Sequence, residues 1–519
     1  MQLSRLAETS RAVGATRSRN AKRDLIAALL TETPVTELEI ATAWLSGTLR
    51  QRRTGVGWRS LSELPTPAEQ PDPGLQLADV DAVLDGLGAH AGAGSASARA
   101  AAVAELFGRM TTAEQEFLRA VMTGQIRQGA LDSVMLEAIA AAAGLPVATV
   151  RRAAMFSAPT GPVAVAAMTG GAAALAAFTL QVGRPIRPML AGTAADVAAG
   201  VDKVGVVPLV VDTKLDGIRI QVHRDGDDVA VFTRSLDEIS ARLPGVVAAT
   251  RSLPVSRLIL DGEALGVDAE GRPLPFQETA SATASTEGTV DAGIRPFFFD
   301  LLLHDIGGTD HDLLDEPLSA RLAALDQVVP SHQRTGRLLA EHAREASDFF
   351  SAAVDAGQEG VILKHPEAPY AAGRRGSAWI KVKPRQTLDL VVLAVEWGSG
   401  RRRGWLSNIH LGARDPDVPA DDPRHWVMLG KTFKGMTDEM LTWQTERFLA
   451  LEQTRTAHVV HVRPEQVVEI AFDGLQRSTR YPGGLALRFA RVLRYRDDKG
   501  AEEADTLETV RALAGPAHR

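Results

Sequence analysis

Residues 206–224 read VVPLVVDTKLDGIRIQVHR, and this stretch decides the fold. Apolar and β-branched residues fill both of its ends, which predicts two strands joined by a short connection at 214–217. Gly217 allows the chain to follow a tight path there. A lysine at such a junction, here Lys214, can act as a nucleophile if its surroundings keep the amine neutral. A solvated Lys–Asp pair before a turn is the alternative interpretation of the same residues.

Further motifs follow along the chain. In order they are ILDGE (259–263), FFFD (297–300), EGVILK (359–364), WIKVK (379–383), LRFAR (487–491) and RYRDDK (494–499). In order and spacing this series resembles the covalent nucleotidyltransferase superfamily, which comprises DNA ligases, RNA ligases and mRNA capping enzymes. The last two motifs resemble the C-terminal motif of ATP-dependent DNA ligases. The resemblance covers about 186–500, and the first third of the chain resembles the ligase DNA-binding domain more loosely.

The pattern of the chain and this resemblance together predict three domains. The first, at 1–187, is rich in Ala and Leu with apolar residues at helical spacing, which predicts an all-α domain. The resemblance implies that this domain binds DNA. Strands joined by short connections predict an antiparallel α+β domain at 188–386, and the resemblance implies that it is a nucleotidyltransferase (ATP-grasp-like) domain. The strands of 387–519, with one helix at 436–453, predict a C-terminal β-barrel of the OB-fold type.

Two local signals give sharper structural expectations. Asp225-Gly226 lies between the apolar segments 218–224 and 229–234, which predicts a hairpin. Thr112 with Gln115 predicts a capping box at the start of a helix over 112–122.

The composition excludes several classes of protein. With 57 basic and 64 acidic residues the net charge is −7, which argues against a uniformly basic coat for nucleic acid. The chain has no cysteine, which excludes disulfides, cysteine-ligated zinc, iron–sulfur clusters and a cysteine nucleophile. The resemblance adds that NAD-dependent ligases carry a cysteine-ligated zinc finger, so ATP is the expected substrate nucleotide.

No targeting or membrane segment is expected. The N-terminus has no apolar core typical of a signal peptide. Residues 156–183 lack charge but consist mostly of Ala, Gly and Thr, so a buried helix pair is favoured over a membrane span. We therefore expect a cytoplasmic protein at the nucleoid.

The resemblance assigns the chemistry to a few residues. Lys214 would attack the α-phosphorus of ATP and form a lysyl-AMP phosphoramidate. Lys381 and Lys383 alternate on a strand, point to one face and would neutralise phosphate charge. Asp216 would help to position metal or phosphate. The carboxylates expected to hold Mg²⁺ or the ribose are those of Glu263 and Glu359.

Further residues are expected around the nucleotide. Phe299 would stack on adenine, with Phe297 and Phe298 as alternatives, and Asp212 would help to read the adenine amino group where the family often has glutamate. The remaining nucleotide contacts that the resemblance implies are Arg219, Arg234, Arg375, Arg496, Asp498 and Lys499. The last three would close over the triphosphate on a mobile domain. Ala490 and Val492 depart from the proline and phenylalanine common in that motif.

Three basic clusters are candidates for DNA contact. They lie at 50–55 with Arg52 and Arg53, at 125–130 with Arg127 and Gly129, and at 401–403 with Arg401, Arg402 and Arg403. A solvated loop is the alternative for each cluster, because charge runs are commonly only that.

The function expected from these residues is that of an ATP-dependent DNA ligase with ATP and Mg²⁺, acting as a monomer on nicked duplex DNA. An RNA ligase, a capping guanylyltransferase or another polynucleotide nucleotidyltransferase of the same superfamily is the first alternative. A catalytically inactive DNA-binding scaffold is the second, although the complete set of motif residues argues against it.

Overall fold

The computed structural model describes residues 1–51, 54–90, 92, 94–126, 128, 131–157, 159–268, 274, 277–279 and 293–513. The chain divides into two compact units. The first contains Met1–Met189 with the short segments Arg234–Asp237 and Ala371–Arg374, and the second contains Leu190–Thr233, Glu238–Tyr370 and Arg375–Arg519. The expected division into three domains at 187 and 386 stays a prediction.

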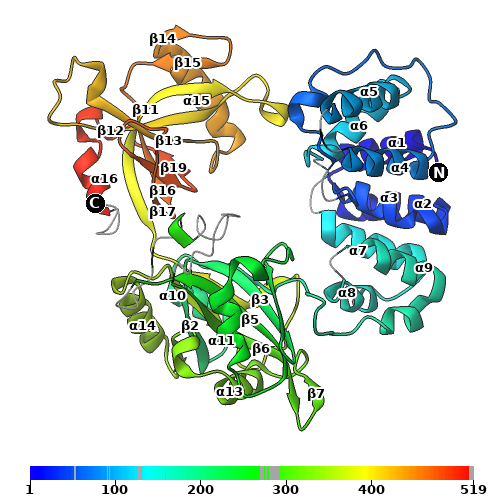
Figure 1. Cartoon of the computed structure of the whole chain (residues 1–519). Coiled ribbons are helices and arrows are strands. Elements are labelled where there is room, and N and C mark those ends of the chain that lie inside the picture. Colours follow the sequence, from blue (N-terminus) through cyan, green and yellow to red (C-terminus); the bar gives the residue numbers. More distant parts are fainter. Residues whose placement is uncertain are drawn as a thin grey trace. The chain divides into compact units, whose positions relative to one another are not determined.

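The first unit is helical, as its apolar periodicity predicts (Figure 1). Its core includes fully buried Trp44, Phe107, Leu118 and Ile139. The described helices of the unit are α1 (Leu3–Ala15), α2 (Arg19–Glu32), α3 (Leu38–Leu45), α4 (Leu77–Ala89), α5 (Ser95–Gly108), α6 (Thr112–Met122), α7 (Leu131–Ala143), α8 (Val147–Met155) and α9 (Gly161–Ala176).

The capping box at the start of α6 lies one residue earlier than expected, so the prediction of Thr112 with Gln115 is wrong. Thr111 is the N-cap residue, because its backbone is extended (φ −67°, ψ 164°), and its hydroxyl accepts from the Glu114 N–H. The Glu114 carboxylate in return accepts from the Thr111 N–H at 2.8 Å. Gln115 instead donates to the Phe107 carbonyl (2.8 Å). The adjacent threonines give two overlapping cap patterns, and tertiary contacts of Gln115 select between them.

The helix α9 lies within the uncharged segment 156–183. Gly171 has non-helical angles (φ 59°, ψ −145°) and kinks this helix. Across the described residues, no helix has the length and the apolar character that crossing a bilayer requires.

The N-terminal half of the second unit carries two five-stranded sheets (Figure 1). The first has the order β1-β10-β9-β2-β8, and the second has the order β4-β3-β5-β6-β7. Their strands are β1 (Leu190–Thr193), β2 (Leu209–Lys214), β3 (Ile218–Asp225), β4 (Asp228–Thr233), β5 (Arg257–Gly266), β6 (Ile294–Ile306), β7 (Thr309–Asp312), β8 (Arg337–Ala340), β9 (Gly360–Lys364) and β10 (Arg375–Val382). The accompanying helices are α10 (Val197–Val204), α11 (Pro244–Arg251), α13 (Leu318–Val328) and α14 (Ala343–Asp355).

The pairing of these strands is antiparallel except between β1 and β10, which run parallel. The predicted hairpin is confirmed, since β3 and β4 pair antiparallel across Asp225-Gly226. Gly226 has φ 61°, the left-handed conformation that such a turn favours.

The C-terminal half of the second unit is built on another sheet with the order β13-β12-β11-β15-β14. The strand β16 pairs with both β11 and β19. The strands of this half are β11 (Gln386–Trp397), β12 (Leu406–Arg414), β13 (Trp426–Thr432), β14 (Glu452–Arg455), β15 (Val459–Val462), β16 (Val467–Phe472), β17 (Gly474–Arg477), β18 (Leu485–Arg488) and β19 (Arg491–Tyr495), and its helices are α15 (Asp438–Ala450) and α16 (Leu507–Leu513).

This half has an OB-like strand content, but the expected closed barrel is not confirmed. Within the described residues β19 pairs only with β16, and the sheet does not close on itself. The long strand β11 changes partner along its length, pairing with β16 over 386–391 and with β15 over 394–396. A register shift between Val392 and Ala394 separates the two regions.

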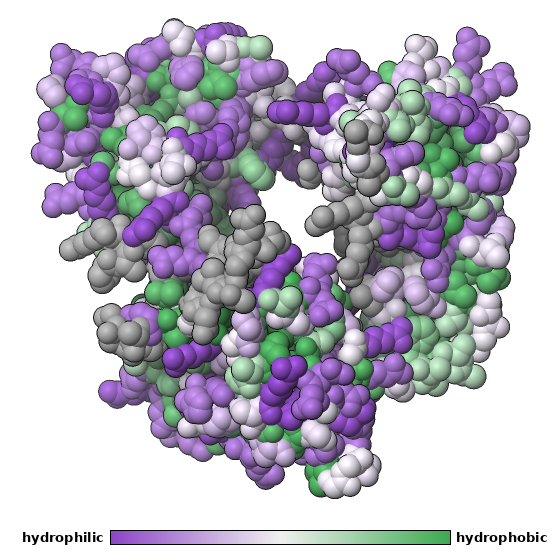
Figure 2. Space-filling model, in the orientation of Figure 1, coloured by the Kyte–Doolittle hydropathy of each residue, from purple (hydrophilic) through white to green (hydrophobic). Residues whose placement is uncertain are grey.

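The surface mixes polar and apolar residues. On the face shown in Figure 2, hydrophilic and hydrophobic side chains are interspersed over the coloured parts of the molecule. Large apolar side chains that are at least half exposed include Trp58 in the first unit and Phe433 and Phe489 in the second.

Candidate active site

Lys214 lies at the C-terminal end of β2, where three strands of one sheet converge. It pairs in register with Gly360 at the start of β9, and the Glu359 N–H donates to the Lys214 carbonyl at 3.0 Å. The Glu359 carboxylate forms ion pairs with the ammonium groups of both Lys214 and Lys383. The structure therefore brings three of the expected site residues together, although 145 residues separate Lys214 from Glu359.

Two glycines make this convergence possible. A Cβ on Gly217 would lie 2.4 Å from the Ala264 carbonyl oxygen, so the connection after β2 passes directly against β5. Gly360 has φ 135°, and a Cβ there would lie 2.2 Å from the Val382 carbonyl oxygen. The tight path expected at Gly217 thus comes from close packing of backbone on backbone.

The lysines of β10 and its end differ in their surroundings. Burial lowers the pKa of Lys381, and the nearby cations Lys383, Lys214 and Arg375 lower it further. Burial also acts to lower the pKa of Lys383, but the carboxylates of Glu359 and Asp473 outweigh it and the pKa is raised. An anion such as a phosphate bound beside Lys381 would act against this lowering of its pKa.

Glu263 lies on β5 opposite Arg219 of β3. Burial raises the pKa of Glu263 to about 7, although Lys214 and Arg219 act to lower it. The negative charges of Glu359 and Asp261 act in the same direction as burial. The two cations therefore do not fully offset the cost of burying the ionised Glu263 carboxylate. A further cation beside this carboxylate would stabilise its ionised form.

An aromatic and cationic cluster lies beside these residues. The rings of Phe299 and Trp379 meet edge to face with centroids 5.9 Å apart. The Arg219 guanidinium lies 5.4 Å from the Phe299 centroid, and the Lys364 ammonium lies 4.8 Å from it. Of the three phenylalanines considered for stacking, Phe298 is fully buried in the hydrophobic core, whereas Phe299 lies in this cluster.

Two ion pairs involve residues of this cluster. Asp212 and Lys364 form a pair at 2.5 Å with both side chains 2% exposed. Arg219 donates to the Asp261 carboxylate at 2.6 Å, and the Tyr370 hydroxyl donates to the same carboxylate at 2.6 Å. Asp212 and Arg219 were expected to contact the nucleotide, and here each of them also has a carboxylate or ammonium partner within the protein.

Sequence reasoning missed Lys364, Asp261, Trp379 and Tyr370 as members of this region. The first three stand inside the motifs EGVILK, ILDGE and WIKVK. A charged residue within an otherwise apolar strand was the available signal for Lys364 and Asp261, because buried charge needs a partner. Tyr370 lies in a loop, and no pattern in the sequence marks it.

Three other expected residues are more exposed. Asp216 is 36% exposed, and its carboxylate accepts from Arg488 of the same compact unit at 3.0 Å. Arg375 begins β10 with an exposed side chain. Arg234 follows β4, has an exposed side chain and belongs to the first compact unit. Their roles stay predictions.

The C-terminal motif forms its own ionic network. Arg496 donates from Nε and Nη2 to the Asp498 carboxylate at 2.8 and 2.7 Å. Arg496 Nη1 and Lys499 Nζ both donate to Asp389 Oδ2, at 2.8 and 2.7 Å. The structure thus brings Arg496, Asp498 and Lys499 together around a further carboxylate that sequence reasoning missed.

The candidate DNA contacts are placed unequally. Arg52, Arg53, Arg127 and Gly129 lie outside the described residues. Arg401 pairs with Asp438, Arg402 donates to the Phe433 carbonyl, and Arg403 has an exposed side chain. A role of Arg401, Arg402 and Arg403 in DNA contact stays a prediction.

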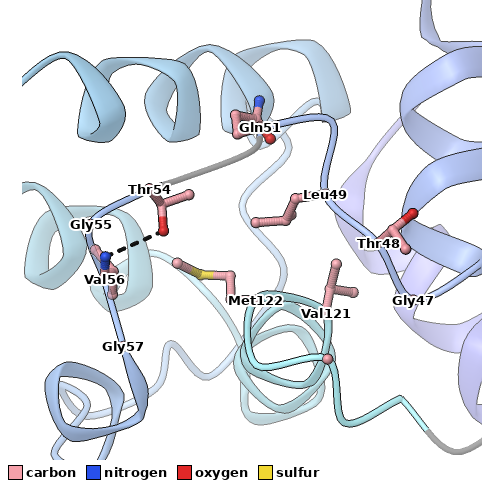
Figure 3. Close-up of a pocket in the computed structure, with 11 residues that line it drawn as sticks. Gly47, Thr48, Leu49, Gln51, Thr54, Gly55, Val56, Gly57, Val121 and Met122 are labelled. Atoms are coloured by element: carbon pink, nitrogen blue, oxygen red, sulfur yellow. Dashed lines mark hydrogen bonds between the residues drawn. The ribbon is translucent and has the colours of Figure 1, made fainter. Parts of the chain in front are cut away.

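A pocket of about 540 Å³ lies in the first unit, and Figure 3 shows residues that line it. Its lining comes from residues 47–49, 51 and 54–57 and from the end of α6, with Leu49, Val121 and Met122 as apolar members. Thr54 accepts a hydrogen bond from the Val56 N–H at 3.3 Å.

Known proteins resemble the chain along its whole length. The model of the ATP dependent DNA ligase domain matches residues 188–383, and that of the ATP dependent DNA ligase C terminal region matches residues 402–499. The chain is 62% identical to a Beutenbergia cavernae protein named probable DNA ligase, over 99% of this chain and 100% of that protein. It is 58% identical to a Nocardioides protein of the same name, over 98% of each chain.

A solved structure titled Pmar-Lig_PreS3 has the same fold, with a TM-score of 0.61 at 18% identity. The match covers 95% of this chain and 99% of that chain. Sequence motifs, fold and relatives agree, and the chain belongs to the family of ATP-dependent DNA ligases.

Proposed function

We propose that this protein seals nicks with 5′-phosphate and 3′-hydroxyl ends in duplex DNA at the expense of ATP. The observation that carries the proposal is the position of Lys214 beside Glu359 and Lys383, next to the aromatic cluster of Phe299 and Trp379. A purine nucleotide needs a ring-stacking surface and a cationic region for its phosphates within one site, and this region supplies both.

The reaction would proceed in three steps. The Lys214 amine attacks the α-phosphorus of ATP, so that a P–N bond forms and the bond to the β-phosphate breaks, releasing pyrophosphate. An oxygen of the DNA 5′-phosphate then attacks the same phosphorus, breaks the P–N bond and takes the AMP. Finally the 3′-hydroxyl attacks the 5′-phosphate, which forms the phosphodiester and releases AMP. Lys381 and Lys383 would offset phosphate charge in the first two steps.

Glu263 and Glu359 are the residues that would hold Mg²⁺. The raised pKa of Glu263 fits this role, because the neighbouring cations leave its charge incompletely compensated. The described residues contain no preassembled group of three metal-ligating His, Asp or Glu side chains. When bound, Mg²⁺ would supply charge shielding for the phosphates, and other ligands would come from nucleotide oxygens and water.

The nucleophile can be tested by labelling. The protein is incubated with α-³²P-ATP or α-³²P-GTP and Mg²⁺ and analysed on a denaturing gel. We expect label from ATP on the wild type and none on Lys214→Ala. Lys203→Ala is the matched control, since its ammonium lies outside the site and donates to the Thr193 carbonyl. Label that survives Lys214→Ala would refute the assignment.

The polynucleotide substrate can be tested with nicked duplexes that carry DNA or RNA on either side of the nick. Sealing of all-DNA nicks supports the proposal, and a requirement for RNA ends would favour an RNA ligase. We further propose that the protein acts as a monomer in the cytoplasm at the nucleoid, in repair, replication or recombination. Light scattering of the purified protein would test the first point.

A further inference from the structure

The carboxylate of Asp389 lies at the centre of the C-terminal ionic network. Asp389 is on β11, and its side chain is 12% exposed. Its Oδ2 atom accepts from both Arg496 and Lys499, whose side chains are 14% and 29% exposed. Removing a carboxylate from water is unfavourable unless charged partners satisfy it, so this arrangement joins β11 firmly to the turn at 496–499.

The same carboxylate holds two cations close together. Arg496 and Lys499 would repel each other without a shared anion, and the nearby Arg496 charge acts to lower the pKa of Lys499. The hydrogen bond to Asp389 is the larger effect, and the pKa of Lys499 is raised. Asp389 therefore stabilises a geometry in which both side chains are charged and adjacent.

Hydrogen bonds of the backbone hold Asp389 and Arg496 in place. The Asp389 N–H donates to the Asp505 carboxylate at 2.7 Å, and the Asp505 N–H donates to the Asp389 carbonyl at 2.8 Å. The Arg496 N–H donates to the Val467 carbonyl at 2.9 Å. The position of Asp389 is therefore set by both β11 and the segment that leads into α16.

We infer that Asp389 is a positioning residue for lysyl-AMP formation, which holds Arg496 and Lys499 ready to receive the triphosphate of ATP. A site whose cations are already in place loses less free energy to ordering when the anion binds. The inference rests on the proposed function, because Arg496 and Lys499 matter in this way only if ATP is the substrate. Asp389 itself touches no reacting atom.

The test separates the first step of the reaction from the last. Formation of lysyl-AMP involves a triphosphate, whereas sealing of a synthetic nick that already carries AMP involves neither ATP nor pyrophosphate. The full-length Asp389→Asn variant keeps the shape of the side chain and loses its charge. We expect its single-turnover rate of lysyl-AMP formation from α-³²P-ATP to fall about tenfold to a hundredfold, as for the loss of a hydrogen bond to charged groups.

The Asp389→Asn variant should seal the pre-adenylated nick at close to the wild-type rate. A general folding defect would instead slow this reaction as well. Glu396→Gln is the matched control, since Glu396 is a carboxylate further along the same strand, β11, that pairs with Lys431 at 2.5 Å. We expect this variant to form lysyl-AMP at the wild-type rate.

A double-mutant cycle tests whether Asp389 acts through its two partners. Adding Asp389→Asn to the Arg496→Ala/Lys499→Ala variant should cause little further loss, because the groups that it positions are already absent. A full additional loss, wild-type adenylation by Asp389→Asn, or equal loss of both reactions would each overturn the inference. Label on Lys214→Ala would instead contradict the proposed function, so the two failures are distinguishable.

Discussion

At the scale of single residues, the candidate site is dominated by paired charges. Glu359 contacts both Lys214 and Lys383, Asp212 pairs with Lys364, and Arg219 pairs with Asp261. Glu263 is the exception, because burial raises its pKa to about 7. Its protonation state therefore changes within the physiological pH range.

This shift has a consequence for stability. The folded-state pKa of Glu263 is raised above its ordinary value of 4.5, so the folded protein binds this proton more tightly than the unfolded chain does. The stabilisation from the protonated Glu263 carboxyl is complete below about pH 4.5 and is lost as the pH rises through 7. Glu263→Gln removes this loss, since the amide is neutral at every pH. In urea unfolding without Mg²⁺ or nucleotide, the free energy of unfolding of Glu263→Gln relative to wild type should rise by about 3 kcal/mol from pH 5 to pH 8.5.

Glu446→Gln, on the exposed face of α15, is the control for this experiment. It should change the free energy of unfolding equally at the two pH values. If the free energies of unfolding of Glu263→Gln and the wild type changed in parallel with pH, the raised pKa of Glu263 would be contradicted.

At the scale of elements, the C-terminal ends of β2 and β10 lie close to the N-terminal end of β9. Gly360 sits where β9 begins, with φ 135° and with the Val382 carbonyl 2.2 Å from where a Cβ would stand. Any side chain there must push β9 away from β10, and Glu359 moves with it.

Gly360→Ala should therefore lower the free energy of unfolding by about 1–3 kcal/mol, the typical strain of such a backbone conformation. It should also reduce lysyl-AMP formation more than this instability explains, because the Glu359 carboxylate is displaced from Lys214. Gly376→Ala on β10 is the control, since nothing lies within 4 Å of its added Cβ. Equal behaviour of the two variants would show that the close approach at Gly360 has no role.

The capping box of α6 allows a second test at this scale. Thr111→Ala should destabilise the protein by about 1 kcal/mol, because it removes the acceptor for the Glu114 N–H. Thr112→Ala, one residue later and already helical, should leave the free energy of unfolding nearly unchanged. Chemical denaturation of both variants checks the position of the cap, and a larger effect at Thr112 would restore the original expectation.

At the scale of the whole molecule, charge is unevenly placed along a chain of net charge −7. Residues 373–385 contain five basic and no acidic side chains. The cluster 401–403 adds three arginines, of which Arg401 is paired with Asp438. An acidic protein can therefore still present basic surfaces to a DNA backbone.

Salt dependence will decide whether the cluster 401–403 contacts DNA. Each phosphate contact contributes about 0.9 to the slope of log affinity against log salt, so replacing Arg401, Arg402 and Arg403 by Ser should reduce the slope by up to about 3. The matched control replaces Arg424, Arg455 and Arg463, which are paired with carboxylates two or three residues away. Equal slopes for both triple variants and the wild type would favour the solvated-loop alternative.

Sequence alone predicted the helical and sheet regions and the hairpin at Asp225-Gly226, which the structure confirms. Its motifs also selected Lys214, Glu263, Glu359, Lys381 and Lys383 as candidate site residues, and their roles stay predictions. These depend on local periodicity and on short motifs, both of which are written in consecutive residues.

Only the tertiary structure decided which charges meet. The pairs Asp212–Lys364 and Asp389–Arg496 join positions more than 100 residues apart, and strand register, which no single segment specifies, sets those contacts. The cap at Thr111 and the open C-terminal sheet were decided in the same way, because the contacts of Gln115 and the change of partner along β11 depend on segments distant in sequence.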